Sequence, residues 1–156
     1  MGTKPRERLK SEDELQQVCS VRLGGRLFGV PIRTILEIVG SVRPQPVPLA
    51  REFVGGLVHY RGEVLTTVSL RRLLELPPAE ASQDLLVIED SRGCFGLLVD
   101  KVVEVTRVSD ADYEPNPSTL AERRKSLFAG TYKLKQGLMV MLDPEQLDPM
   151  KLARVS

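Results

Sequence analysis

FGVPIRTILEI at residues 28–38 and FGLLVDKVVEV at residues 95–105 match almost position by position. Phe, Gly and Glu coincide, and nearly every apolar position of one stretch is apolar in the other. Further matches follow in the same order, the last after a slip of one residue: 53–55 with 128–130, Gly62 with Gly137, and 64–68 with 138–142. Short strands match easily by chance, but two matched blocks in the same order indicate an internal repeat.

Short apolar runs separated by Gly and Pro surround these two stretches. Two runs that flank Gly24-Gly25, and two that flank residues 90–93, carry the signal of a β-hairpin. The expected strands are 18–23, 26–30, 35–39, 63–70, 85–89, 94–99, 102–108 and 138–142. We expect one helical turn at 71–76, and loops at 43–48, 110–114 and 115–125. Many short strands at regular spacing indicate a β-barrel or a β-sandwich.

Each repeat unit, roughly 18–80 and 84–148, is too small to bury much core alone. We therefore expect two related β-units that pack face to face, with a flexible tail at 1–15 and a C-terminal tail at 151–156. The candidate core residues are Phe28, Val30, Ile32, Leu65, Phe95, Leu97, Val99, Val140 and Leu142.

The composition is that of a soluble globular protein, with 156 residues, 42% hydrophobic and 28% charged. A net charge of +1 argues mildly against nucleic acid as the partner. No apolar run approaches the roughly 18–20 residues that a membrane helix needs, and residues 1–17 do not read as a secretion signal. Cys19 and Cys94 are far apart in the sequence, so we expect two buried thiols rather than a disulfide or a metal site.

Four segments resemble the CheW family, in order and at the family's spacing. LGGRLFGVPI at 23–32 is similar to its opening hairpin, and ILEIV at 35–39 resembles its next strand. FVGGLVHYRG at 53–62 resembles its F-x-x-G-x-x-x-x-R-G signature, and GLLVDKV at 96–102 its G-L-x-V-D-x-V block. The resemblance covers about Val18 to Leu147.

The resemblance implies a mainly all-β fold over residues 16–150, with two five-stranded SH3-like barrels around a shared apolar core and short helical turns. It implies a non-enzymatic adaptor that links membrane chemoreceptors to a CheA-type histidine kinase. The partners would be the regulatory domain of the kinase and the cytoplasmic tip of the receptor, whose helical hairpin enters a groove between the barrels. The adaptor would be cytoplasmic, held at receptor arrays by its partners, without membrane insertion or nucleic acid.

Three positions depart from the family pattern. His59 stands where the family usually has Asn, Ser69 where it often has Asp, and Pro144 would stop a strand in the second repeat. The departures leave the fold prediction intact and make an adaptor of a secondary pathway, such as surface motility, an alternative.

The receptor- and kinase-binding candidates are Arg61, Glu37, Ile35, Val39, Gly56 and Gly62. Arg61 precedes Gly62 between two strands, where a guanidinium can fork onto a carboxylate or bridge carbonyls, so signalling and structural roles both stay open. If Leu36 and Ile38 face the core, then Ile35, Glu37 and Val39 share the outer face and form a partner surface. An ordinary edge-strand glutamate is the alternative for Glu37. Gly56 and Gly62 are expected to support Arg61 through their backbone freedom.

No motif for catalysis, metal or nucleotide binding accompanies these residues, so we expect no cofactor, no metal and no enzyme. No nucleophile motif accompanies the only histidine, His59. The acidic stretch 110–114 is not part of an EF-hand loop, because the Gly and the terminal Glu of such a loop are absent. A small barrel that binds nucleic acid is the remaining alternative. Its aromatic platform would be poorly supplied, because the four phenylalanines fall on repeat-equivalent positions that look like core.

Overall fold

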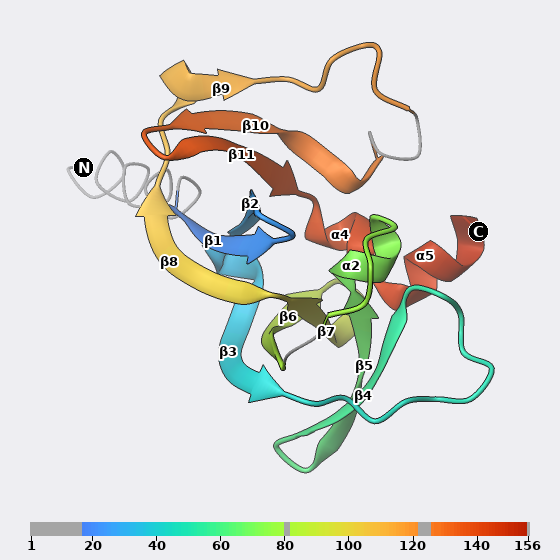
Figure 1. Ribbon diagram of the computed structural model, residues 1–156. Coiled ribbons are helices and arrows are strands. Elements are labelled where there is room, and N and C mark those ends of the chain that lie inside the picture. Colours follow the sequence, from blue (N-terminus) through green and yellow to red (C-terminus); the bar gives the residue numbers. More distant parts are fainter. Residues whose placement is uncertain (1–16, 80–81, 122–125, 156) are drawn as a thin grey trace, which may run out of the picture.

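The structure is a computed structural model that describes residues 17–79, 82–121 and 126–155. Nearly all of its regular elements are β-strands (Figure 1). The strands are β1 (Gln17–Leu23), β2 (Arg26–Pro31), β3 (Ile35–Val42), β4 (Val54–Tyr60), β5 (Glu63–Ser69), β6 (Gln83–Asp90), β7 (Gly93–Val99), β8 (Lys101–Arg107), β9 (Tyr113–Glu114), β10 (Phe128–Leu134) and β11 (Gly137–Leu142). The helices are η1 (Ile32–Thr34), α2 (Leu70–Leu73), η2 (Asp110–Asp112), α4 (Pro144–Leu147) and α5 (Pro149–Val155).

The strands form two sheets, and each sheet takes strands from both repeats. One sheet has the order β8-β1-β2-β11-β10-β9 and the other β3-β6-β7-β5-β4. The parallel pairs β2 with β11 and β5 with β7 join one repeat to the other inside each sheet. The mainly β prediction is confirmed, and two β-units do pack around a shared core, but neither unit consists of one repeat alone. The two units are intertwined, because the first strand of each repeat pairs with the third strand of the other.

Each sheet curls until its two ends meet. After β3, Gln45 exchanges two backbone hydrogen bonds of 2.8 Å with Leu57 of β4, at the opposite end of its sheet. After β8, the two residues of β9 pair with β10 in the same manner. Pairing of this kind gives partners to backbone N–H and C=O groups at the edges of the sheet, as it does in small barrels. We call the barrel that contains β1 and β2 the first barrel and the one that contains β3 and β4 the second. The β9 strand, which was expected to be a loop, gives the first barrel six strands rather than five.

The registers of the two barrels repeat, so a pseudo-two-fold relation connects them. Ile35 pairs with Ile88 in one barrel, and the equivalent Val102 pairs with Val21 in the other. The register also corrects the sequence alignment by one residue. Both Ser69 N and Asp143 N donate to the carbonyls at the start of the preceding strand, on Phe53 and Leu127 respectively. Leu127 rather than Phe128 is therefore the structural equivalent of Phe53, and no slip is needed before β11.

Buried apolar side chains gather in three clusters, one inside each barrel and a larger one between the barrels. Strand β6 shows how the sequence supplies two of them. Leu85 and Val87 point into the second barrel, whereas Leu86 and Ile88 point into the shared core. Successive side chains of a strand point to opposite faces, so a strand buried on both faces is a continuous apolar run. All predicted core residues are buried except Ile32 and Val140, which are half-buried against the shared core.

Two expectations for single segments differ from the structure. The expected tail at 151–156 is part of α5 as far as Val155, and Leu152 is 8% exposed within the shared core. Cys19 is buried as predicted, but Cys94 is exposed because it lies at the start of β7 beside the hairpin turn. The expected tail at 1–15 and residues 122–125 of the expected loop lie outside the described residues.

Candidate functional site

The hairpin between β4 and β5 places Arg61 at its tip. Arg61 has φ 49° and Gly62 has φ 80°. Positive φ at both central residues is the geometry of a two-residue type I′ turn, whose twist matches that of the strands. Gly62 adopts this conformation without cost, and an added Cβ there would meet open space. The turn holds the Arg61 side chain outside the barrel, with 75% of its surface exposed.

Arg61 reaches across the barrel end to Glu37 on β3. Its Nη2 lies 2.6 Å and its Nε 3.2 Å from Oε1 of Glu37, and the Tyr60 hydroxyl donates to the same oxygen at 3.0 Å. The guanidinium carbon also lies 5.5 Å from the centre of the Tyr60 ring. Hydrogen bonds from Arg61 and then from Tyr60 lower the pKa of Glu37. The structure thus brings two predicted residues together and adds Tyr60, which the sequence analysis did not propose.

The exposed face of β3 is opposite to the predicted one. Ile35, Glu37 and Val39 do share a face, but Ile35 packs against the shared core and Val39 against the interior of the second barrel. Leu36 and Ile38 are the outward residues, 50% and 41% exposed. Both faces of this strand carry apolar residues, so the period of two gives the pairing of faces but not which one is buried.

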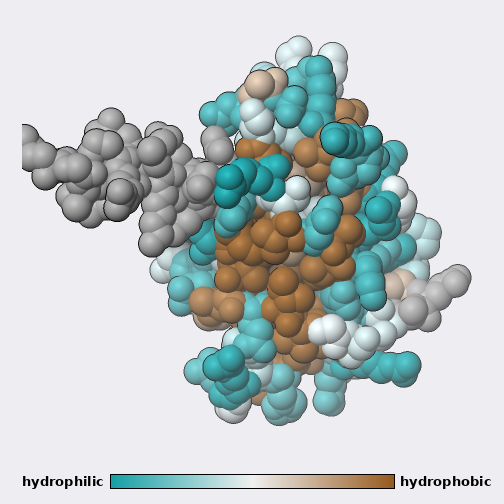
Figure 2. All heavy atoms as spheres, turned by 90° about the vertical axis from the view of Figure 1, so that its left-hand side faces the viewer, coloured by the Kyte–Doolittle hydropathy of each residue, from teal (hydrophilic) through white to brown (hydrophobic). Residues whose placement is uncertain are grey.

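Strands β3 and β8 carry exposed apolar residues at repeat-equivalent positions. Asp84 connects the two strands, since its carboxylate accepts from the backbone N–H of Ser41 at the end of β3 and of Val102 on β8. Figure 2 looks onto the side of the molecule that carries β3 and β8 in Figure 1 and shows a continuous apolar area there. We call Leu36, Ile38, Val103 and Val105 the β3–β8 surface; Val103 and Val105 are 41% and 51% exposed.

The repeat alignment could have identified this surface. It pairs Leu36 with Val103 and Ile38 with Val105, two sets of apolar residues at equivalent positions. The missing information was the outward direction of both strands. Glu104, the repeat equivalent of Glu37, is exposed as expected.

Gly56 has a structural task. Its φ is 119°, and an added Cβ would lie 2.6 Å from the carbonyl oxygen of Gln45. That contact belongs to the Gln45–Leu57 bridge that closes the second barrel. Only glycine combines this backbone conformation with such a close approach. Gly56 therefore supports the hairpin that carries Arg61, in line with the supporting role expected of it.

Among the described residues, no group of three or more His, Cys, Asp and Glu side chains could hold a metal ion. No helix in the part of the chain that the structure describes has the length and apolar character needed to cross a membrane.

Comparison with known proteins agrees with this architecture. The model of the CheW-like domain matches residues 17–149. The chain belongs to the CheW family. A chemotaxis protein CheW from Helicobacter pylori is 30% identical over 142 residues, which cover 88% of this chain and 86% of that protein. A protein named FrzA from Myxococcus xanthus is 29% identical and covers 65% of each chain.

The solved structure of the scaffolding protein CheW from Thermoanaerobacter tengcongensis has the same fold, with a TM-score of 0.73 at 22% identity. The alignment covers 82% of this chain and 88% of that structure. Because the chain belongs to the CheW family over most of its length, it is a chemotaxis coupling adaptor. The CheW family is a family of non-catalytic adaptors.

Proposed function

We propose that this CheW-family protein links the cytoplasmic tip of a chemoreceptor to a CheA-type histidine kinase without catalysing a reaction, and that the β3–β8 surface docks the receptor. The observation that carries the proposal is the pairing of exposed apolar residues on two adjoining strands. Leu36, Ile38, Val103 and Val105 each expose 41% or more of their surface. A continuous apolar area lies on the side of the molecule that carries β3 and β8 (Figure 2). Contiguous apolar surface with a polar rim is typical of a protein docking site.

Glu37 lies on the opposite face of β3 from Leu36 and Ile38, and its pair with the exposed Arg61 would add a polar contact beside the apolar surface. Arg61 is mostly exposed, and its guanidinium already bonds Glu37 through two nitrogens. A partner carboxylate near the hairpin tip would find a guanidinium held in one orientation rather than a freely rotating side chain. Such a pair contributes direction and register more than affinity. Ile35 and Val39, predicted as direct contacts, would then act by holding β3 against the core.

The kinase would bind elsewhere on the barrels, since an adaptor needs two separate surfaces. A regulatory domain with the same fold could pair with a barrel of this chain through its strands. Joining receptor and kinase through one adaptor raises their effective local concentration. Regulation follows if the two kinase states bind the assembly with different affinities. The protein would work in the cytoplasm, held at receptor arrays by these contacts.

The phenylalanines do not supply the stacking platform that the alternative of a nucleic-acid-binding barrel would need. Phe28, Phe53 and Phe95 are buried, and Phe128 is half-buried against the shared core. Stacking of bases on exposed aromatic rings is the usual means by which small barrels bind single strands.

A binding assay with point variants tests the proposal. The double variant Ile38→Ser/Val105→Ser removes apolar contact at two equivalent positions of the β3–β8 surface. We expect at least a tenfold weaker association with receptor fragments, because truncation of an interface anchor costs about 1–2 kcal/mol or more. The decrease of the thermal melt should be small, since neither side chain belongs to a buried cluster.

The matched control is Met150→Ser on α5, which is 61% exposed and lies on the other side of the molecule in Figure 1. Association of the control with receptor fragments should equal that of the wild type. Equal binding by the double variant and the control would refute the assignment of this surface. The same assay with the regulatory domains of different kinases decides between a main and a secondary pathway.

A further inference from the structure

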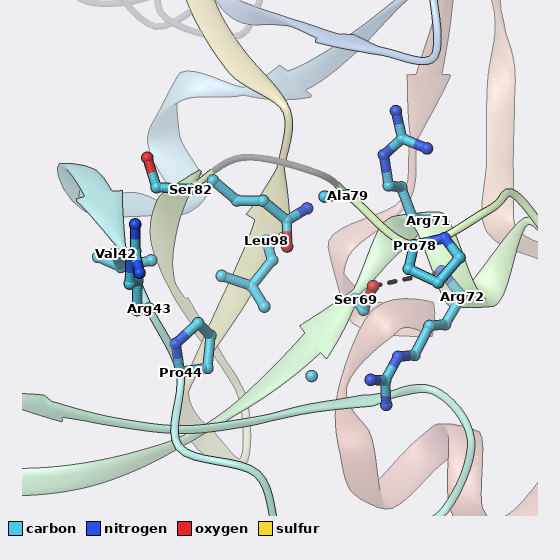
Figure 3. A pocket seen from close by; sticks show the side chains of 12 residues that line it. Val42, Arg43, Pro44, Ser69, Arg71, Arg72, Pro78, Ala79, Ser82 and Leu98 are labelled. Carbon is cyan, nitrogen blue, oxygen red and sulfur yellow. Dashed lines mark hydrogen bonds between the residues drawn. The ribbon is translucent and has the colours of Figure 1, made fainter.

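The second barrel has a hollow of about 350 Å³ beside α2. It lies between the end of β3, the start of β4, the first turn of α2 and the segment that leads into β6 (Figure 3). Its lining residues are Val42, Arg43, Pro44, Gly55, Ser69, Arg71, Arg72, Pro78, Ala79, Ser82, Gln83 and Leu98. This hollow is separate from the β3–β8 surface, and none of the receptor-binding candidates lines it.

Positive charge dominates the wall of this hollow. Three arginines line it, and none of the described residues around it is an aspartate or a glutamate. The charge of Arg71 is balanced by Asp100, because its Nε and Nη2 donate to the two carboxylate oxygens of Asp100 at 2.7 and 2.8 Å. Arg72 uses Nη1 to bond the carbonyl of Val54, and a guanidinium carries five N–H groups in all. Arg43 and Arg72 therefore leave positive charge at the hollow.

Gln83 supplies a donor without an acceptor. Its Nε2 is buried and has no hydrogen-bond partner among the described residues. Gln83 also lines an adjoining hollow of about 350 Å³ together with Arg71 and Ser82, so its amide lies between two cavities. A buried N–H without an acceptor is costly, so a turn of the Gln83 side chain that brings this nitrogen to the wall of the hollow would let a ligand oxygen accept from it. Two hydroxyls, those of Ser69 and Ser82, line the same hollow.

The repeat equivalent of this hollow has the opposite charge. A hollow of about 500 Å³ beside α4 is lined by Asp143 and Glu145, which are the structural equivalents of Ser69 and Arg71, together with Glu89 and Asp90. The fold thus accommodates either charge at this position. The positive character beside α2 is a property of this chain's own residues and is not required by the architecture. Ser69 is uncharged where its structural equivalent in the other hollow is Asp143.

We propose that the hollow beside α2 binds a small ligand that carries an oxyanion, a phosphate or a carboxylate group. Arg43 and Arg72 neutralise the oxyanion, and Leu98 and Pro44 contact the apolar part of the ligand. The Gln83 amide donates to one of the ligand oxygens once its side chain turns toward the hollow. Guanidinium groups and amide donors around a small concave site are the usual means of oxyanion recognition. The adaptor would then respond to a soluble anion independently of receptor and kinase.

Amide-detected NMR titration of the full chain tests the proposal. The probes are inorganic phosphate and succinate, with sodium chloride at matched ionic strength as the reference. We expect saturable shifts of the Ser82 and Gln83 amides with at least one oxyanion and none of that size with chloride. The stronger of the two probes identifies the ligand as a phosphate or a carboxylate.

Two variants and one control make the result specific. Arg43→Gln removes an exposed charge, and Gln83→Glu replaces the donor by a carboxylate of the same shape. Each variant should raise the dissociation constant for the oxyanion at least tenfold. A thermal melt close to that of the wild type would confirm that the variant is folded. Arg33→Gln, at the acidic hollow, should leave it unchanged. Equal shifts with chloride, or equal affinities of Arg43→Gln and Arg33→Gln, would overturn the proposal. Receptor binding is measured separately, so neither result decides the other.

Discussion

The packing of α5 against the shared core is tested most directly at Leu152. The sequence pattern predicts a tail at 151–156, whereas the structure has the helix α5 with Leu152 inside the shared core. Replacement of Leu152 by Ala removes three carbons from a side chain that is 8% exposed. At about 0.8 kcal/mol for each buried carbon, the transfer loss is about 2.4 kcal/mol.

The cavity that remains adds to this loss, but a terminal helix can shift to fill it. Leu→Ala changes in cores cost about 2–5 kcal/mol, and we expect Leu152→Ala at the lower end, about 2.5 kcal/mol. For a chain of this size, each kcal/mol lowers the melting temperature by about 2–4 °C, so the expected decrease is about 5–10 °C.

Urea unfolding followed by far-ultraviolet circular dichroism measures the effect, since the chain has no tryptophan for fluorescence. The matched control is Met150→Ala on the same helix, where the side chain is 61% exposed. Its free energy of unfolding should stay within about 0.5 kcal/mol of the wild-type value. If Leu152→Ala is as neutral as Met150→Ala, the packing of α5 on the core is refuted.

Two further predictions concern a glycine and an ion pair. Gly56→Ala should destabilise the fold by about 3 kcal/mol or more in urea unfolding, since a backbone conformation of this kind costs about 1–3 kcal/mol and the new Cβ would also meet a carbonyl oxygen at 2.6 Å. Gly62→Ala, which meets open space, should cost only about 1 kcal/mol, and equal losses would contradict this account. Hydrogen bonds from the arginine partner of Asp100 lower the pKa of this carboxyl in the folded state. The ionised Asp100 therefore contributes stability above the unfolded pKa of about 3.9. This contribution is lost as pH falls through the lower folded pKa. The stability gap between wild type and Asp100→Asn should therefore be larger at pH 7 than at pH 3; a gap independent of pH would show that the ionised carboxylate contributes nothing.

Two of the predicted site residues lie together in the structure. The residue pattern around Arg61-Gly62 predicts a turn, and the resemblance to the family predicts a binding role for Arg61 and Glu37. Their mutual contact spans 24 positions of the chain and depends on how β3 curves past the β4–β5 hairpin. The outward face of β3 was assigned wrongly, because both faces of Ile35–Val39 carry apolar residues and their period does not name the buried side.

The local properties of the chain are written in its sequence. Apolar runs bounded by Gly and Pro define most of the strands, and turn signals such as Gly24-Gly25 indicate hairpins. The repeat of residues 28–38 in residues 95–105 defines a fold with two related halves. These features depend on neighbours in the chain, so a sequence displays them directly. Which strands pair across the halves depends on contacts between residues far apart, and no local pattern encodes them. Only the tertiary structure shows that each barrel is built from both repeats and that Leu36, Ile38, Val103 and Val105 are exposed.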